Sequence, residues 1–250
     1  KLTAARTATT PSLSQAIEQE LPALGMPNAR IVVVVEPLPV GADTVVRTKD
    51  GRALSSSGAD RVELRFSANA GEQAAALAKV ASGGELSRVL LAVKRVLLDK
   101  DPVPVSVFDE VDAGVGGAVG EAIGEKLQAI AGRSRQVLCI THLPQIASRG
   151  ETHLVVAKRV TDGRTVSSVR IVGEAEREGE VARMLGGREI TATTLSHAKE
   201  MLEQARLARE ALLAATPSID VVTMPTSTAA TEKKTTKPKK AASSRAASPA

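Results

Sequence analysis

Two adjacent carboxylates, Asp109 and Glu110, directly follow the short apolar run Val105 to Phe108, which is typical of a buried strand. Acids at the carboxyl end of such a strand lie at the crevice where open α/β sheets bind ligands. One carboxylate can hold Mg²⁺, directly or through water, while its neighbour orients and deprotonates an attacking water. A strand that ends in Asp-Glu is also common without any chemistry, so the alternative is a pair of solvated loop acids.

A second candidate is the segment Ser82-Gly83-Gly84-Glu85, which precedes an apolar helical pattern. As a helix cap, Ser82 would accept a hydrogen bond from a first-turn backbone N–H group, and Glu85 would return one. The same geometry can bind a phosphate, because glycines let it approach the backbone and a helix N-terminus attracts negative charge. Taken alone, the segment favours the capping function.

The segments around these motifs predict a parallel sheet. A helix is expected to follow Ser82 and to end near Pro102. Short apolar strands are expected at residues 105–108 and 136–141, with a helix over residues 118–131 between them. A strand, a helix and a strand in that order imply a right-handed crossover in a parallel sheet that is buried on both faces. The apolar face predicted for the first helix consists of Leu86, Val89, Leu90, Val93 and Leu97.

Antiparallel strands are predicted before and after this sheet in the sequence. Before it, residues 30–35, 45–48 and 61–67 predict strands of one lobe, with a turn at Asp50-Gly51. After it, residues 153–159 and 165–172 flank Asp162-Gly163 and predict a hairpin.

Three parts of the chain are expected from its helical patterns and composition. Residues 1–21 repeat their apolar positions every four residues and would be the end of a longer coiled-coil helix. Residues 22–215 would form the folded lobe, and its last two helices are predicted at residues 178–185 and 194–215. Residues 216–250 are rich in Thr, Ser, Ala, Lys and Pro, and cannot offset their ordering entropy by burial, so they are predicted to be a disordered basic tail.

The net charge of +5 depends on where the basic residues lie. Beyond residue 222 there are six basic residues against one acid, which leaves 27 of the 33 basic and 27 of the 28 acidic residues in residues 1–222. Charge alone therefore does not argue that the folded part binds DNA. Only 1% of the residues are aromatic, so base-stacking platforms for single-stranded nucleic acid are not expected.

Cysteine and histidine content restricts the chemistry further. Cys139 is the single cysteine, which excludes an intramolecular disulfide, and the three histidines lie far apart in the sequence. A reducing cytosol fits this composition, and no run of about 20 apolar residues predicts a membrane span. Cys139 is expected to be a small buried residue, and His153 and His197 are expected to be ordinary surface or hairpin residues. The first residue is Lys1, so the chain is expected to be a fragment of a longer protein.

The motifs gain weight from their order along the chain. The segment Ala81 to Glu85, the acidic pair, the segment Val111 to Gly114 and His142 follow one another, and this is the order of signature motif, Walker B motif, D-loop and switch histidine in ATP-binding-cassette proteins. In the sequence of these motifs and several other segments, the chain resembles the RecN family of SMC-like ATPases over about residues 1–213. The segments that carry the resemblance are Leu24 to Pro27, Lys79 to Arg88, Phe108 to Asp112, Thr141 to Ala147 and Ala182 to Gly187.

This resemblance implies the C-terminal portion of an α/β ATPase head of the ABC/SMC type, with a P-loop NTPase fold, a parallel sheet, a flanking antiparallel β lobe and the end of a coiled coil. Ser82, Gly83 and Gly84 would contact the γ-phosphate of ATP that a partner head holds, with Glu85 supporting the turn. By the same resemblance, Asp109 would assist Mg²⁺, directly or through water, and Glu110 would be the catalytic base. Asp112 would link the two heads, and His142 would sense the γ-phosphate.

The resemblance also implies what must complete the site. No G-x-x-x-x-G-K-[ST] loop occurs in the sequence, and in the resembled family this loop lies in an N-terminal segment. The chain alone is therefore expected to be inactive, and ATP and Mg²⁺ would bind with the N-terminal half of the head present. Further expected partners are a second copy, double-stranded DNA and recombinase filament proteins, in the bacterial cytoplasm at the nucleoid. The basic tail could contact DNA phosphates, although such a run is usually a solvated tail.

The resemblance implies ATP hydrolysis in the repair of DNA double-strand breaks, and three other functions compete with it. One is a head module for dimerisation or DNA docking that has no chemistry of its own. The second is another SMC-like or transporter cassette ATPase, although the sequence of Thr141 to Gln145 argues against a transporter. The third is dinucleotide binding by Gly114 to Gly120, where the spacing of the third glycine is wrong and two acids intrude near the phosphate position. The acids near Asp109 also lack the later ligands of a calcium loop.

Overall fold

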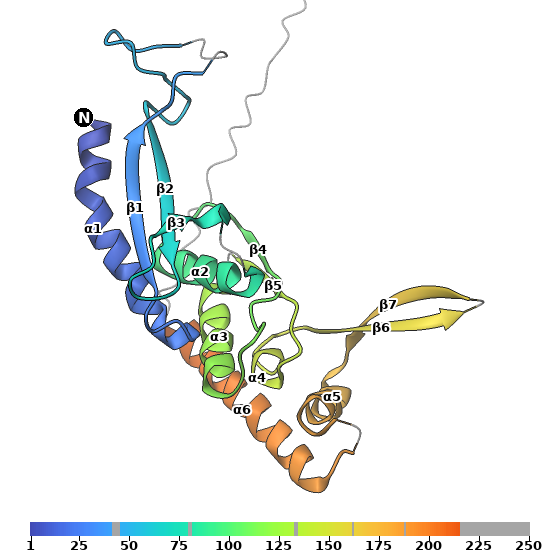
Figure 1. The fold of residues 1–250 in the computed structure, drawn as a ribbon. Helices are drawn as coiled ribbons and strands as arrows, with labels where there is room; N and C mark the ends of the chain where they lie inside the picture. The colour runs from blue at the N-terminus through green and yellow to red at the C-terminus, as the bar shows by residue number, and fades with distance from the viewer. Residues whose placement is uncertain (42–45, 80–81, 133–134, 162, 188, 216–250) are drawn as a thin grey trace, which may run out of the picture. The chain divides into compact units, whose positions relative to one another are not determined.

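The computed structural model describes residues 1–41, 46–79, 82–132, 135–161, 163–187 and 189–215 (Figure 1). The tail predicted at 216–250 lies outside the described residues, as do Ala81 of the signature segment, Val45 of a predicted strand and Asp162 of the predicted hairpin turn. The elements form one unit with an α/β composition, so the predicted fold class is confirmed at that level. None of the described helices combines the length and the apolar character that a membrane span requires.

An antiparallel lobe opens the chain, as predicted. Helix α1 (Leu2–Glu20) and the short 3-10 helix η1 (Pro22–Leu24) precede strands β1 (Arg30–Pro37) and β2 (Asp60–Ser67), which pair along their whole length. The short strand β3 (Ala75–Ala76) adds to β2, and the 3-10 helix η2 (Leu77–Lys79) follows it. Helix α1 lies along β1 (Figure 1). Residues 46–48 belong to no named strand, and Arg47 forms only an isolated bridge to Ala53 around the turn at Asp50-Gly51.

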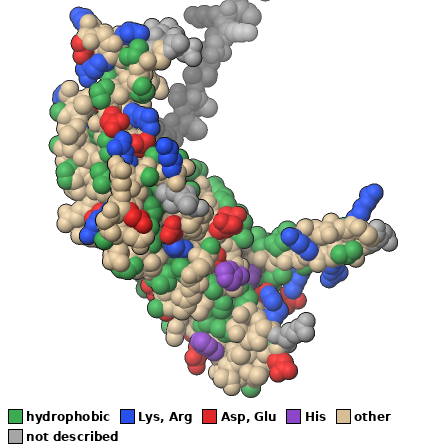
Figure 2. Space-filling view, in the orientation of Figure 1, with side chains coloured by type: hydrophobic (Ala, Val, Ile, Leu, Met, Phe, Trp, Pro, Cys, Tyr) green, Lys and Arg blue, Asp and Glu red, His purple; other side chains and the backbone are tan. Residues whose placement is uncertain are grey.

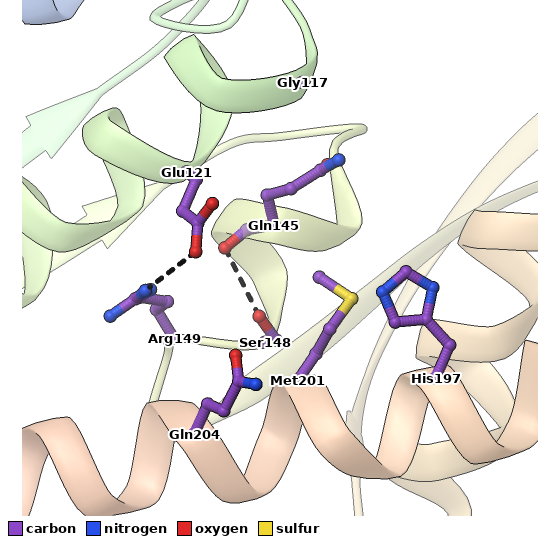
Figure 3. Close-up of a pocket in the computed structure, with 8 residues that line it drawn as sticks. All are labelled: Gly117, Glu121, Gln145, Ser148, Arg149, His197, Met201 and Gln204. Atoms are coloured by element: carbon purple, nitrogen blue, oxygen red, sulfur yellow. Dashed lines mark hydrogen bonds and ion pairs between the residues drawn. The ribbon is translucent and has the colours of Figure 1, made fainter.

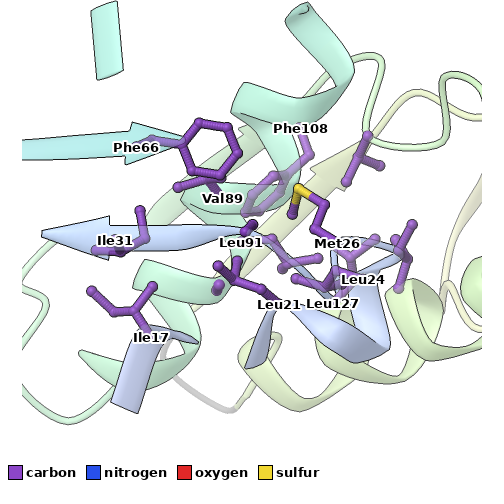
Figure 4. Close-up of a cluster of buried hydrophobic side chains, with 14 of the residues drawn as sticks. Ile17, Leu21, Leu24, Met26, Ile31, Phe66, Val89, Leu91, Phe108 and Leu127 are labelled. Carbon is purple, nitrogen blue, oxygen red and sulfur yellow. The ribbon is translucent and has the colours of Figure 1, made fainter. Parts of the chain in front are cut away.

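A buried apolar cluster joins this lobe to the following helices (Figure 4). Alternate residues of β1 point inward, so Ile31 is buried opposite Phe66 of β2 while the intervening Val32 is 45% exposed. Leu21 at the end of α1 is completely buried within the same cluster, because the helix ends directly against the sheet. Aliphatic side chains fill most of the cluster, and Phe66 and Phe108, the two aromatic residues of the chain, are both in it.

Helix α2 (Gly83–Val96) begins after Ser82 as predicted, and its predicted face is buried in part, since Val89 is completely buried and Val93 packs against the core cluster. Leu90 is 41% exposed, whereas Leu91 is completely buried and Arg88 is only 7% exposed, so the buried face is rotated from the predicted one. A search for apolar residues could not find Arg88, which compensates for its burial with a hydrogen bond to the backbone of a neighbouring loop. The buried residues of α2 are Gly84, Arg88, Val89, Leu91 and Ala92.

The predicted parallel pair is present, formed by β4 (Val105–Phe108) and β5 (Gln136–Cys139), with Phe108 opposite Cys139. Helix α3 (Gly117–Ile130) connects the two strands. The prediction that this sheet is buried on both faces is wrong for this chain. Val107 is 65% exposed and Ile140, just beyond β5, is 61% exposed, because the core cluster covers only the opposite face of the pair.

The last elements follow the predicted order. A short helix α4 (Pro144–Ala147) occupies the predicted turn, and strands β6 (His153–Thr161) and β7 (Arg164–Val172) form the predicted hairpin. Helices α5 (Glu174–Gly186) and α6 (Ala192–Ala215) then pack against each other. Helix α6 also contacts α3, where the Gln128 side chain donates to the backbone oxygen of Ala205 at 2.9 Å.

Candidate active site

The signature segment forms the N-terminus of α2, with Ser82 as its cap. The Ser82 hydroxyl oxygen accepts a hydrogen bond from the backbone N–H of Glu85 at 3.4 Å, which is the first half of the predicted capping box. Ser82 and Gly83 are exposed, while Gly84 is buried. The helix therefore presents an open, side-chain-poor first turn, which is the geometry in which backbone N–H groups can receive an anion.

The glycine turn lies directly against the acidic pair. A Cβ atom placed on Gly83 would lie 2.5 Å from the Glu110 carboxylate oxygen Oε2, and one placed on Gly84 would lie 2.9 Å from Cβ of Ala113 and 3.0 Å from the backbone oxygen of Glu110. At Gly84 the neighbours are a Cβ atom and a backbone oxygen, so glycine is required there for the turn to approach the loop this closely, whereas at Gly83 the neighbour is the end of the exposed Glu110 side chain, which can move aside. Two motifs separated in the sequence thus meet in one corner of the fold.

Two side chains of α2 hold the ends of the loop that follows β4. The Ser87 hydroxyl donates to the backbone oxygen of Asp109 at 2.7 Å, and the Arg88 guanidinium donates to the backbone oxygen of Ala113 at 3.0 Å. Burial lowers the pKa of Arg88, an effect that nearby Glu85 opposes. Neither Ser87 nor Arg88 is given a role by the sequence pattern, although both belong to the segment that carries the family resemblance.

Glu110 itself has an unusual backbone. Its φ angle is 56°, in the left-handed region, and it is the one described non-glycine residue with a positive φ. Such a conformation costs free energy in a residue with a Cβ, and it persists where the surroundings impose it. The backbone N–H of Glu110 donates to Oδ1 of Asp109 at 2.9 Å, and both carboxylates remain exposed. The acidic pair is therefore accessible to a ligand.

Asp112 differs from the other candidate residues because it is only 3% exposed. Its Oδ2 atom accepts hydrogen bonds from the Thr141 hydroxyl at 2.6 Å and from the backbone N–H of His142 at 2.9 Å. The same oxygen lies 3.0 Å from Nδ1 of the His142 ring. The loop after β4 and the loop after β5 are thereby joined, while the His142 side chain stays 72% exposed.

Asp109 is the predicted Mg²⁺ residue. Across the described part of the chain, no three His, Cys, Asp or Glu side chains gather in a way that could hold a metal ion. The exposed carboxylate of Asp109 thus fits a Mg²⁺ ion that takes one protein oxygen and draws its other ligands from water and phosphate, which is the usual coordination of Mg²⁺ at nucleotide sites.

A cavity lies elsewhere in the described structure. It has a volume of about 360 Å³ and lies between α3, α4 and α6, where Arg149 pairs with Glu121 (Figure 3). It is lined by Gly117, Glu121, Gln145, Ser148, Arg149, His197, Met201 and Gln204, so none of the predicted site residues borders it. Predicted as an ordinary surface residue, His197 is part of this lining.

Cys139 is close to the candidate site but is unsuited to nucleophilic chemistry. The thiol is half-buried on β5, and burial, together with the negative charges of Asp112 and Asp109, raises its pKa to about 12. The thiol therefore stays protonated at neutral pH, and only a thiolate is an effective nucleophile.

Figure 2 shows Lys and Arg side chains along the β6–β7 hairpin. The basic residues of the described hairpin are Lys158, Arg159, Arg164 and Arg170.

The chain is similar to known DNA repair proteins over much of its length. Over 210 residues the chain is 44% identical to the DNA repair protein RecN of Streptomyces coelicolor, covering 83% of this chain and 36% of that protein. The chain is similar to part of the RecN proteins. It is also 49% identical over 179 residues to RecN of Deinococcus radiodurans, covering 72% of this chain and 29% of that protein. The match to RecN of Bacillus subtilis is 49% over 152 residues and covers 61% of this chain and 26% of that protein.

The chain thus spans about a quarter to a third of the length of the RecN proteins that it matches. No model of a protein family matches it. Among solved structures, an Smc head domain with a coiled coil and joint from Pyrococcus yayanosii has a TM-score of 0.44 at 18% identity and covers 81% of this chain and 30% of that one. A structure from work on ATP-driven dimerization and DNA-stimulated activation of SMC ATPases has a TM-score of 0.41 at 15% identity. This match covers 75% of this chain and 99% of that one.

Proposed function

We propose that this chain is the C-terminal part of a RecN-like DNA repair ATPase, and that it supplies the signature motif, the Walker B acids and the switch histidine of an ATP site shared between two heads. The observation that carries the proposal is the contact between the glycine turn and the acidic loop, where a Cβ on Gly83 would lie 2.5 Å from the Glu110 carboxylate. The relationship to RecN proteins supports the same function.

The proposed reaction is hydrolysis of ATP to ADP and phosphate. Glu110 orients and deprotonates the attacking water, and Asp109 helps to hold Mg²⁺, which supplies charge stabilisation on the phosphates when it is bound. The N-terminus of α2, with Ser82, Gly83 and Gly84, receives the γ-phosphate of ATP that is bound to a second head, and Glu85 supports this turn. His142 senses the γ-phosphate of the ATP that its own head holds.

Two further parts of the molecule are needed in this proposal. The phosphate-binding loop comes from an N-terminal half of the head, and the chain alone does not turn over ATP. Support comes from the bare face of the β4–β5 pair, where Val105 is 45%, Val107 is 65% and Leu138 is 40% exposed. A parallel sheet is stable when both faces are covered, so this face requires a covering segment.

The remaining partners follow from the same proposal. A second copy of the protein completes the shared site, and double-stranded DNA stimulates its assembly during break repair in the bacterial cytoplasm at the nucleoid, with recombinase filament proteins as further partners. The competing function is a head module that assembles or docks on DNA without chemistry. The bare apolar face of the β4–β5 pair would serve such a module equally well, so only a measurement of turnover separates the two functions.

Steady-state ATPase activity tests the proposal. It is measured for this chain alone, for a separate polypeptide that carries the N-terminal half of the head, and for their mixture, each with and without duplex DNA. Activity that appears only in the mixture is expected. Turnover by this chain alone would contradict the requirement for a second half, and a silent mixture whose complex is confirmed by gel filtration would favour the non-catalytic module.

The base is tested by Glu110→Gln in the active mixture. Turnover is expected to fall about 10²- to 10⁴-fold, the usual contribution of a general base, while ATP binding is retained. Glu200→Gln, the same change at an exposed position of α6, serves as the matched control and should leave turnover unchanged. Residual turnover near the control level in the Glu110 variant would remove Glu110 from the role of base.

A further inference from the structure

Asp112 is placed in the fold as a group that serves its own chain. Its carboxylate is buried, and Oδ2 receives the Thr141 hydroxyl, the backbone N–H of His142 and Nδ1 of the His142 ring within 3.0 Å. Taking a charged carboxylate out of water is costly unless hydrogen bonds replace its solvation. All three groups that replace it belong to the residue pair 141–142.

The arrangement places the carboxylate beside the His142 ring, with Oδ2 3.0 Å from Nδ1. A carboxylate only accepts hydrogen bonds, so a hydrogen bond across this distance requires the proton on Nδ1 and leaves Nε2 on the opposite side of the ring. The ring is otherwise open, because the side chain is 72% exposed. Among the described residues, Asp112 is the one acid within ion-pair distance of the ring nitrogens, and the same oxygen also accepts from the backbone N–H of His142 at 2.9 Å.

Asp112 is itself held from the side of α2. Its neighbour Val111 is completely buried, and the backbone oxygen of Ala113 accepts from Arg88 at 3.0 Å. The loop that carries the carboxylate is therefore fixed before any partner arrives, which is what a support for another catalytic group requires.

We infer that Asp112 is a positioning residue that orients His142 within the same head. This assignment replaces the bridging role between two heads that the family resemblance implied, since a carboxylate that is 3% exposed and satisfied by residues 141 and 142 presents little to a second molecule. The inference rests on the proposed function, because the histidine has a task only if the site turns over ATP.

A double-mutant cycle on the intact ATPase tests this inference, using Asp112→Asn, His142→Ala and the pair together. Asparagine matches the size of aspartate but presents a neutral amide, which is a poorer acceptor and also a donor. The single Asp112→Asn change is expected to lower kcat about 10- to 100-fold, the usual cost of losing the carboxylate partner of a functional histidine. KM for ATP should change less than about threefold, because a positioning defect acts on the chemical step.

The coupling between the two residues separates positioning from a general loss of structure. If Asp112 acts through His142, the Asp112→Asn change lowers kcat by less than about twofold once His142 is already alanine. Equal losses in both backgrounds would overturn the inference. Asp60→Asn is the matched control, because Asp60 is another buried and hydrogen-bonded carboxylate, and it should leave kcat unchanged.

A measurement that needs no turnover gives a second decision. The chain contains three histidines, so ¹⁵N labelling of histidine with the His142→Ala variant as the reference assigns the His142 signals. The wild-type protein should show a protonated Nδ1, and Asp112→Asn should lose this tautomer preference while Asp60→Asn keeps it. An unchanged tautomer in Asp112→Asn would overturn the inference. If the wild-type protein has no ATPase activity, the proposed function fails, and the ¹⁵N result still decides what Asp112 does to the ring.

Discussion

The two antiparallel pairs of this molecule, β1–β2 and β6–β7, obey the same local rules but differ in what covers them. In β1–β2 the inward residues Ile31 and Phe66 are 1% and 4% exposed, because α1 and the central cluster lie against that face. In β6–β7 the paired residues Leu154 and Ile171 are 49% and 69% exposed. Both pairs have apolar residues opposite one another. These residues are buried in β1–β2 and exposed in β6–β7.

The difference shows that strand alternation predicts which face needs a cover and says nothing about which segment provides it. Val156 and Val169, the next pair along the same face of the hairpin, are 64% and 63% exposed. The β1–β2 lobe obtains its cover from α1 within this chain, whereas the hairpin has an apolar face without one among the described residues. Stability of the chain should therefore reside in the lobe and the central cluster.

The largest expected effect comes from Leu21→Ala in the covered region. Leu21 is completely buried where α1 meets the cluster, so its truncation removes apolar burial and leaves a cavity. The free energy of unfolding should fall by about 2–5 kcal/mol, the range for buried leucines. Urea denaturation of the chain, monitored by far-ultraviolet circular dichroism, measures this change.

Leu207→Ala provides the matched control, because Leu207 is a helical leucine that is 51% exposed. Its effect should stay within about 0.5 kcal/mol. If the two variants lost equal stability, the central cluster would not be the part of the chain that holds the fold.

A smaller effect is expected from Asp60→Asn, which loosens the attachment of α1 to the lobe. Asp60 begins β2, and its carboxylate accepts from the Thr3 hydroxyl at 2.7 Å and from the Arg6 guanidinium at 2.9 Å. The Thr3 hydrogen bond is the largest cause of a lowered Asp60 pKa, and Arg6 contributes to the same shift. The folded state thus favours the ionised carboxylate, and the stability it contributes is present above the ordinary pKa of 3.8 and lost as the pH falls below it.

The measurement is the urea midpoint of the wild-type and Asp60→Asn chains at pH 7 and at pH 3. The wild-type chain should be the more stable one at pH 7, and the gap should shrink at pH 3, below the ordinary pKa of 3.8, where the unfolded chain takes up a proton on this carboxylate more readily than the folded one. A gap that stays constant between the two pH values would show that the charge of Asp60 does not attach the helix.

Much of the fold could be predicted because local patterns specify it. The alternation in residues 61–67 predicted β2, and the Ser82 cap predicted the start of α2 to within one residue. The burial of Val89 on α2 was predicted, but the burial of Arg88 could not be, because it depends on the backbone oxygen of Ala113, which is remote in the sequence. The open face of β4–β5 was also beyond prediction, because an apolar strand does not reveal which of its neighbours belong to the same chain.

The candidate site divides along the same line. The types of Ser82, Asp109, Glu110 and His142 could be selected from the sequence, because each belongs to a motif with known chemistry, and their roles stay predictions. The partners of Asp112 could not be selected, because Thr141 and His142 reach it only through the parallel pairing of β4 with β5. Ser87 was overlooked because its hydroxyl donates to the backbone oxygen of Asp109, which belongs to a different motif.

The smallest expected effect comes from Ile171→Ser on the exposed apolar face of the hairpin. It tests directly how the β6–β7 pair differs from the covered β1–β2 pair. In this chain alone the free energy of unfolding should change by no more than about 0.5 kcal/mol, because a side chain that is 69% exposed has little burial to lose. In a mixture with the N-terminal half, the same change should weaken association if that segment covers the hairpin, because a polar hydroxyl then replaces buried apolar surface. Isothermal titration calorimetry measures this affinity, with Val32→Ser on the outer face of β1 as the control. Equal affinities for the wild-type and Ile171→Ser chains would mean that the hairpin stays bare in the assembled head, and that its apolar face meets some other partner.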